Sequence, residues 1–123
     1  MKLLTADIRK KMPGPRAQEN NPDPVVYAKF FHPWTQWTWF AYEAWAYVGN
    51  VDDGYREVSL GEAPDADPED VVFFGLVYGD YTEYGTFALQ DLMENSVERD
   101  RHFTPKPLSQ VKEEMRKRGY SDF

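Results

Sequence analysis

The chain has 123 residues, of which 16% are aromatic, contains no cysteine and carries a formal net charge of −7. This length is typical of a single domain. The absence of cysteine excludes a disulfide framework, a thiolate metal site and a cysteine nucleophile. The start, MKLLTADIRKK, lacks the apolar core of a signal peptide, and no apolar run approaches the roughly 20 residues of a membrane helix. We therefore expect one cytoplasmic domain, residues 1–123, that does not interact with membranes.

The negative charge is concentrated in one part of the chain, residues 50–70. That stretch has one base, Arg56, and eight acids: Asp52, Asp53, Glu57, Glu62, Asp65, Asp67, Glu69 and Asp70. It therefore accounts for the whole net charge of −7. It also contains two glycines and two prolines, which favour turns. The pattern predicts an acidic loop insertion at about residues 50–70, with a short strand possible over 55–60.

The first half of the chain predicts one helix and two strands. Residues 1–12 predict a short helix with Thr5 as its N-cap, ended by the Pro-Gly-Pro at 13–15. Alternation predicts strands at 25–31 and 36–43, joined by a turn at 32–35. Beyond Ala41 the alternation becomes ambiguous, which indicates an early strand end or a bulge.

The second half predicts two further strands and a closing helix. The run VVFFGLVY at 71–78 is typical of a central strand covered on both faces, and Gly75 within it indicates a bulge or a close crossing. Residues 84–89 return as a fourth strand, followed by one or two helical turns at 89–94. Apolar residues at helical spacing predict a helix over 108–118, with Gly119 as its C-cap.

Together these elements predict an α+β fold in one domain. We expect an antiparallel sheet of four or five strands in meander order. One face of this sheet should pack against both the N-terminal and the C-terminal helix.

Four segments of the sequence carry a resemblance to a known family: LLTADIRKKMPGPRAQENNPDPVVYAKFFHPWTQWTWFAYEA, VVFFGLVYG, EYGTFALQDL and ERDRHFTPKPLSQV. The chain resembles a bacterial family of small domains of unknown function that are often carried on plasmids, phages and integrative elements. The resemblance covers most of the chain outside residues 44–70. It implies a mobile-element setting and a mixed sheet-and-helix fold, and it transfers no catalytic or binding residue.

Catalytic and metal motifs are absent from the sequence. Glu98, Asp100 and His102 alternate, so an extended segment would place them on one side as an acid–base or metal cluster, or as paired charges on an edge strand. Counted from Asp65, the sixth and twelfth positions of a calcium loop hold Asp70 and Leu76 rather than Gly and Glu. We therefore expect no enzyme, no metal site and no cofactor.

Aromatic residues are the strongest candidates for binding. All four tryptophans lie between residues 34 and 45, and Trp37 and Trp39 share one side of a strand. Trp34, Trp37 and Trp39 could stack on nucleobases, anchor a protein interface or belong to the core. The candidate binding residues are these tryptophans and six acids: Asp52, Asp53, Asp65, Asp67, Glu69 and Asp70.

Two binding functions follow from these patterns. The first is a non-catalytic module of a mobile genetic element that binds a protein, for example as an acidic inhibitor occupying the basic site of a host defence or DNA-handling protein. The alternative is a nucleic-acid-binding accessory protein. It rests on the basic ends, since residues 1–16 carry five bases against one acid and residues 99–118 carry seven against three.

Overall fold

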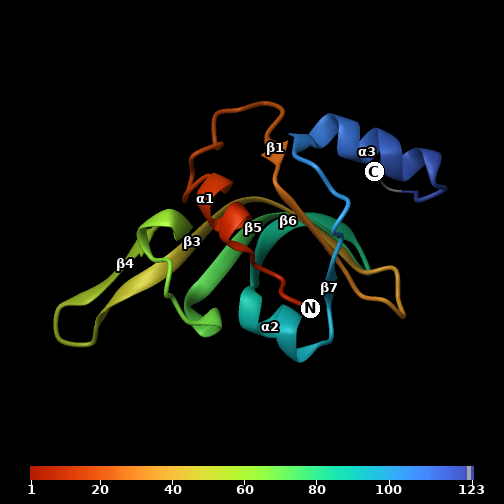
Figure 1. Ribbon diagram of the computed structural model, residues 1–123. Coiled ribbons are helices and arrows are strands. Elements are labelled where there is room, and N and C mark those ends of the chain that lie inside the picture. The colour runs from red at the N-terminus through yellow and green to blue at the C-terminus, as the bar shows by residue number, and fades with distance from the viewer. Residues whose placement is uncertain (122) are drawn as a thin grey trace.

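The computed structural model describes residues 1–121 and 123, and within them the chain is organised around a six-stranded antiparallel sheet (Figure 1). Its strands are β2 (Ala28–Phe31), β3 (Thr38–Asn50), β4 (Gly54–Val58), β5 (Val71–Tyr78), β6 (Thr82–Ala88) and β7 (Glu98–Arg99). A separate two-stranded sheet pairs β1 (Val25–Val26) with β8 (Lys106–Pro107). The α+β class and the antiparallel pairing are therefore confirmed.

The strand order differs from the predicted meander. The sheet runs β6-β5-β3-β2-β7, and β4 pairs with the far half of β3 on the same edge as β2. Ala46 shows this arrangement, because it is paired with Val58 of β4 on one side and with Val71 of β5 on the other. The chain therefore crosses from one edge of β3 to the other between β4 and β5, which alternation within single strands could not predict.

This crossing is made by residues 50–70, the stretch that the sequence predicts to be an acidic loop. The stretch 50–70 contains β4 and two short 3-10 helices, η1 (Leu60–Glu62) and η2 (Pro68–Asp70). Leu60 is fully buried in the core and Ala63 lies at its edge, so apolar residues anchor the acidic stretch to the sheet. The extra strand that the sequence allows at 55–60 is present as β4, with bounds Gly54–Val58, and the rest of the predicted acidic loop contains η1 and η2.

Strand β3 is 13 residues long because a bulge lets it continue past the point where alternation fails. Its register with β5 shifts between Ala41 and Glu43, which leaves Tyr42 as the extra residue. Ala41 and Ala44 pack in one apolar cluster, whereas Tyr42 packs in the other. The predicted bulge is confirmed, and it reverses the facing of every residue beyond it.

The helices cover both faces of the sheet. Helices α1 (Ala6–Lys11) and α2 (Leu89–Glu94) lie over one apolar cluster, and α3 (Leu108–Lys117) lies over the other. Figure 1 shows α2 and α3 on opposite sides of the sheet. The prediction that both terminal helices pack on one face was therefore wrong, since β5 presents apolar residues to both faces and each face needs a cover.

The helix ends agree with the sequence signals. The Thr5 hydroxyl accepts a hydrogen bond from the Ile8 N–H at 3.2 Å and caps α1. In α3 the buried stripe is Leu108, Val111 and Met115, and Gly119 follows the helix with a φ of 92°. None of the helices in residues 1–121 and 123 is long and apolar enough to cross a membrane.

Candidate functional site

The turn between β2 and β3 holds Trp34 out in solvent. The His32 N–H donates to the Trp37 carbonyl at 3.0 Å, and the Thr35 N–H donates back to the His32 carbonyl at 3.3 Å. The Trp34 N–H donates to His32 Nδ1 at 3.3 Å, and the two rings meet edge to face with centroids 5.6 Å apart. The Trp34 side chain is nevertheless 79% exposed. A large apolar ring is thus presented on a short, hydrogen-bonded turn.

Trp37 and Trp39 lie side by side, as their alternation predicts. Their ring centroids are 5.8 Å apart with the planes inclined at 32°. Trp37 is 37% exposed, whereas Trp39 packs partly against the core. The Trp37 indole lies directly against Gly79 in the turn between β5 and β6, where a Cβ atom would collide with the ring. Trp37 is therefore partly at the surface and Trp39 partly in the core, and together they form the wall of a surface groove.

The tryptophan pair lines an open groove of about 430 Å³ between the β2–β3 turn and α2. Its lining combines aromatic, aliphatic and polar side chains: His32, Thr35, Trp37, Trp39, Thr86, Phe87, Asp91, Leu92, Asn95 and Val97. We call this the aromatic groove. Phe87 reaches it from β6 and stacks on Phe73 of the core at 5.5 Å, so the groove floor is continuous with the core.

One acid, Asp91, lines the aromatic groove, and it belongs to an acidic stretch of the chain. Residues 80–94 contain four acids, Asp80, Glu83, Asp91 and Glu94, and no lysine or arginine. Asp91 lines the groove itself, and the Asn95 side chain donates to its backbone carbonyl at 2.7 Å, which fixes the end of α2. Indole faces beside a carboxylate attract a cationic side chain, through the ring quadrupole and through charge. The groove therefore offers an aromatic wall and a carboxylate to a cationic side chain.

The six predicted acids lie away from the tryptophans. Asp52 and Asp53 form the tip of the β3–β4 hairpin, where the Asp53 N–H donates to the Asn50 side chain at 2.8 Å. At about 3.3 Å per residue, β3 separates this tip from Trp37 by roughly 40 Å, and Figure 1 shows the two hairpin ends at opposite ends of the molecule. The predicted binding residues therefore form separate regions rather than one site.

The remaining acids surround η2, with Asp65 exposed in the turn before it. Asp67, Glu69 and Asp70 bring carboxylate oxygens within 4.8 Å of one another, with Asp67 and Glu69 exposed. Oxygen ligands of this kind suit hard cations. The group lies at the surface where η2 enters β5, and Asp67 precedes Pro68 as the N-cap residue of η2.

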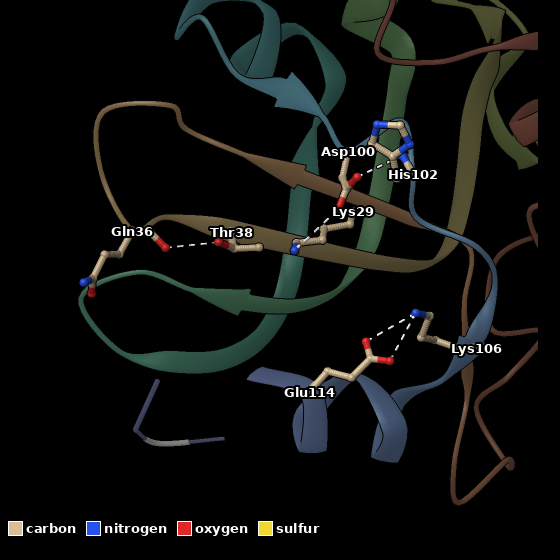
Figure 2. Close-up of polar contacts among 7 residues, drawn as sticks. All are labelled: Lys29, Gln36, Thr38, Asp100, His102, Lys106 and Glu114. Atoms are coloured by element: carbon tan, nitrogen blue, oxygen red, sulfur yellow. Dashed lines mark hydrogen bonds and ion pairs between the residues drawn. The ribbon is translucent and has the colours of Figure 1, made fainter. Parts of the chain in front are cut away.

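The charged segment near residue 100 pairs with a largely buried lysine (Figure 2). Lys29 Nζ lies 3.6 Å from Asp100 Oδ2, and the Lys29 side chain is only 11% exposed. The other Asp100 oxygen accepts the His102 N–H at 2.9 Å. Burial lowers the pKa of Lys29, with Arg118 adding to the decrease, while Asp100 acts to raise it. The predicted alternation of Glu98, Asp100 and His102 fails because β7 ends at Arg99 and the chain turns.

Figure 2 also shows a second ion pair on the α3 side of the sheet, between Lys106 and Glu114 at 3.3 Å. Elsewhere in Figure 2, the Thr38 hydroxyl donates to the Gln36 carbonyl at 3.1 Å. The paired-charge interpretation of the late segment is thus the one that the geometry favours. Asp100 is occupied by Lys29 and the His102 N–H, so the three predicted residues do not converge as an acid–base cluster.

A larger cavity that sequence reasoning missed lies on the α3 side of the sheet. Its volume is about 720 Å³, and its walls include Tyr42, Glu43, Phe74, Tyr84 and Lys112. Burial, with smaller effects from Tyr84 and Glu43, raises the pKa of Tyr42 to about 12. We call this the α3-side cavity. Its walls come from segments far apart in the sequence, and the failure of alternation after Ala41 was the one signal near it.

Comparisons with known proteins identify no relative: no protein-family model, no curated protein and no solved structure matches this chain. The resemblance to a family of mobile-element domains therefore stays a prediction.

Proposed function

We propose that this protein is a non-catalytic binding module that recognises a protein partner through the aromatic groove and the adjacent Trp34. The main observation behind this proposal is that Trp34 is 79% exposed beside a groove walled by Trp37 and Trp39. Tryptophan is the residue most enriched among interface positions that dominate binding energy, and exposing so much apolar surface to water is unfavourable without a partner. The rigid turn lowers the entropy that binding would cost.

The charge of the groove surroundings supports a basic partner surface. The acids between residues 80 and 94 would attract lysine or arginine side chains and speed the encounter. A basic nucleic-acid-binding site on a host defence or DNA-handling protein has this character, and the resemblance to mobile-element domains motivates that choice. The acids at the β3–β4 tip would act separately, because that hairpin tip lies at the opposite end of β3 from Trp37.

Nucleic-acid binding is the second candidate, and the same tryptophans motivate it. Its other premise, a single basic face made by both ends of the chain, loses support because α1 and α3 lie on opposite faces of the sheet. Titration of the intrinsic tryptophan fluorescence with single- and double-stranded oligonucleotides at two salt concentrations distinguishes the candidates. Quenching that weakens steeply with salt would favour nucleic acid over protein.

Site-specific photocrosslinking tests the protein-binding proposal directly. A photoreactive phenylalanine derivative, which keeps an aromatic ring at the substituted position, replaces Trp34 in one variant and Tyr55 in a control, since Tyr55 is also well exposed but lies on β4. We expect position 34 to crosslink a distinct protein in cells that express the chain, and position 55 not to. For that partner, Trp34→Ala should weaken binding at least tenfold. Identical crosslinking from both positions would refute the proposal.

A further inference from the structure

Strand β6 ends the sheet with an open edge. In the described part of the chain it pairs with β5 alone, over all seven residues from Thr82 to Ala88. The opposite end of the sheet is closed by β7, which has only two residues. Natural edge strands are commonly protected by proline, lysine or a covering element, and β6 contains neither residue. An open edge of this length is a template for another strand.

The hydrogen-bonding pattern shows which groups of β6 face outward. The Gly79 N–H donates to the Tyr81 carbonyl at 3.0 Å, which makes these two residues a hydrogen-bonded pair of the hairpin. Because such pairs alternate along an antiparallel ladder, Glu83, Gly85 and Phe87 turn their backbone groups toward β5. The backbone N–H and C=O groups of Tyr84 and Thr86 therefore point away from the sheet.

A hollow lies beside β6 on each face of the sheet. Phe87 and Thr86 line the aromatic groove, and Tyr84 lines the α3-side cavity, where its hydroxyl accepts a hydrogen bond from Lys112 of α3 at 2.9 Å. Side chains of a strand alternate between the two faces of a sheet. A strand added to β6 would therefore direct successive side chains toward the two hollows, which is how strand addition gains specificity.

Charge decides what kind of strand fits. Residues 80–94, which contain β6 and α2, carry four acids and no base. Pairing β6 with β6 of a second copy would bring two such stretches together, at a cost from like-charge repulsion. An arginine or lysine side chain entering the aromatic groove would instead lie between Asp91 and the indole faces.

We infer that the edge of β6 receives an extended, basic segment of the protein partner as an added strand, with cationic side chains in the aromatic groove. This inference rests on the proposed function and specifies the form of the partner. The partner segment would donate to and accept from the outward groups of Tyr84 and Thr86. Its alternate side chains would face the α3-side cavity.

Nuclear magnetic resonance titration of the full ¹⁵N-labelled chain tests the inference. The probe is an end-blocked peptide of seven residues that alternates threonine and arginine, and the control peptide alternates threonine and glutamate. We expect the arginine peptide to shift the backbone amides of residues 82–88 and the Trp37 and Trp39 indole signals. The control peptide should bind at least tenfold more weakly, and added salt should weaken binding of the arginine peptide.

A matched pair of variants isolates the backbone contribution. Thr86→Pro removes an outward N–H while leaving the β5 ladder intact, and Thr86→Val keeps that N–H. We expect Thr86→Pro to weaken binding of the arginine peptide at least tenfold. Thr86→Val should leave the affinity for this peptide within twofold of that of the unchanged chain. Amide spectra of both variants check that the fold is retained. Equal affinities for the two variants would overturn strand addition.

Three other outcomes would also overturn the inference. Shifts confined to the indole signals would leave the aromatic groove as a binding site and remove β6 from it, so the proposed function would survive alone. An absence of shifts at millimolar peptide would refute the basic-strand partner, while the crosslinking experiment would still decide the proposed function. Concentration-dependent protection of the 82–88 amides without peptide would show that a second copy occupies the edge.

Discussion

The carboxylate of Glu43 on β3 accepts the backbone N–H of Gln18 at 2.9 Å, although 25 residues separate the two in the chain. Its other oxygen accepts the Arg16 N–H at 3.1 Å, and the Glu43 side chain is almost completely buried at 5% exposure. Gln18 in turn donates its side-chain amide to the Tyr42 carbonyl at 2.6 Å. The loop before β1 is thus tied to the bulge of β3, with Arg16 held at a φ of 61°.

Replacing Glu43 should therefore release this loop. Glu43→Ala leaves two backbone N–H groups without their acceptor, and we expect a loss of about 3 kcal/mol in the free energy of unfolding, measured in urea. The control is Glu57→Gln, which breaks a surface ion pair with Arg16 at 3.6 Å and should cost less than about 1 kcal/mol. Equal losses in the two variants would contradict the tie.

Gly79→Ala should displace Trp37 from its position in the groove. A Cβ atom at residue 79 meets the indole ring, whereas one at Gly85 meets open space, so Gly85→Ala is the matched control. We expect Gly79→Ala to shift tryptophan emission and to cost about 1–3 kcal/mol of stability. The emission shift should vanish when Trp37 is already phenylalanine. A shift that persists in that background would show that another tryptophan had moved.

Tyr42 should make the protein less stable in alkali. Its pKa is raised to about 12 from 10.0, mainly by burial, so between pH 10 and 12 the unfolded chain releases a proton that the folded chain retains. Below pH 10 the Tyr42 hydroxyl is protonated in both the folded and the unfolded state, so this destabilisation disappears. Across the window the loss of stability approaches about 3 kcal/mol. Urea unfolding at several pH values should therefore give a flatter profile for Tyr42→Phe. Parallel profiles would contradict the assignment.

Lys29 and Asp100 should respond unequally to substitution. Asp100→Asn leaves a largely buried ammonium without its carboxylate, and we expect a cost of about 1–3 kcal/mol. Lys29→Met removes the charge that burial disfavours and should change stability by less than about 1 kcal/mol. The double variant should recover most of the Asp100→Asn loss in thermal unfolding. Simple additivity of the two single effects would show that the pair is not coupled.

Local signals predicted the local structure well. Three features illustrate this: the Thr5 cap, the apolar stripe of α3 and the apolar run of β5. Each depends only on residues close together in the sequence, within one or two helical turns or one strand, so the sequence alone is enough to predict it. The close crossing predicted at Gly75 is also present, since a side chain there would collide with the Phe40 backbone across the β3–β5 pair.

Non-local pairing accounts for what was missed. Alternation does not tell which edge of β3 receives β4, nor which face each terminal helix covers, because these depend on contacts between distant segments. The aromatic groove shows the same limit: Trp37 and Trp39 were predicted as a pair, while Phe87 and Asp91 come from β6 and α2. The acids of residues 50–70 were grouped by sequence and are separated by the fold.

The position of β3 has a consequence for how the molecule comes apart. β3 hydrogen-bonds to β2, β4 and β5, and its residues contribute to both apolar clusters. Because β3 belongs to both apolar clusters, its loss from the sheet would disrupt both of them. The two faces of the sheet therefore cannot unfold independently. Amide protons in the middle of β3 should exchange with solvent only through complete unfolding, at one shared rate, whichever face their neighbours belong to.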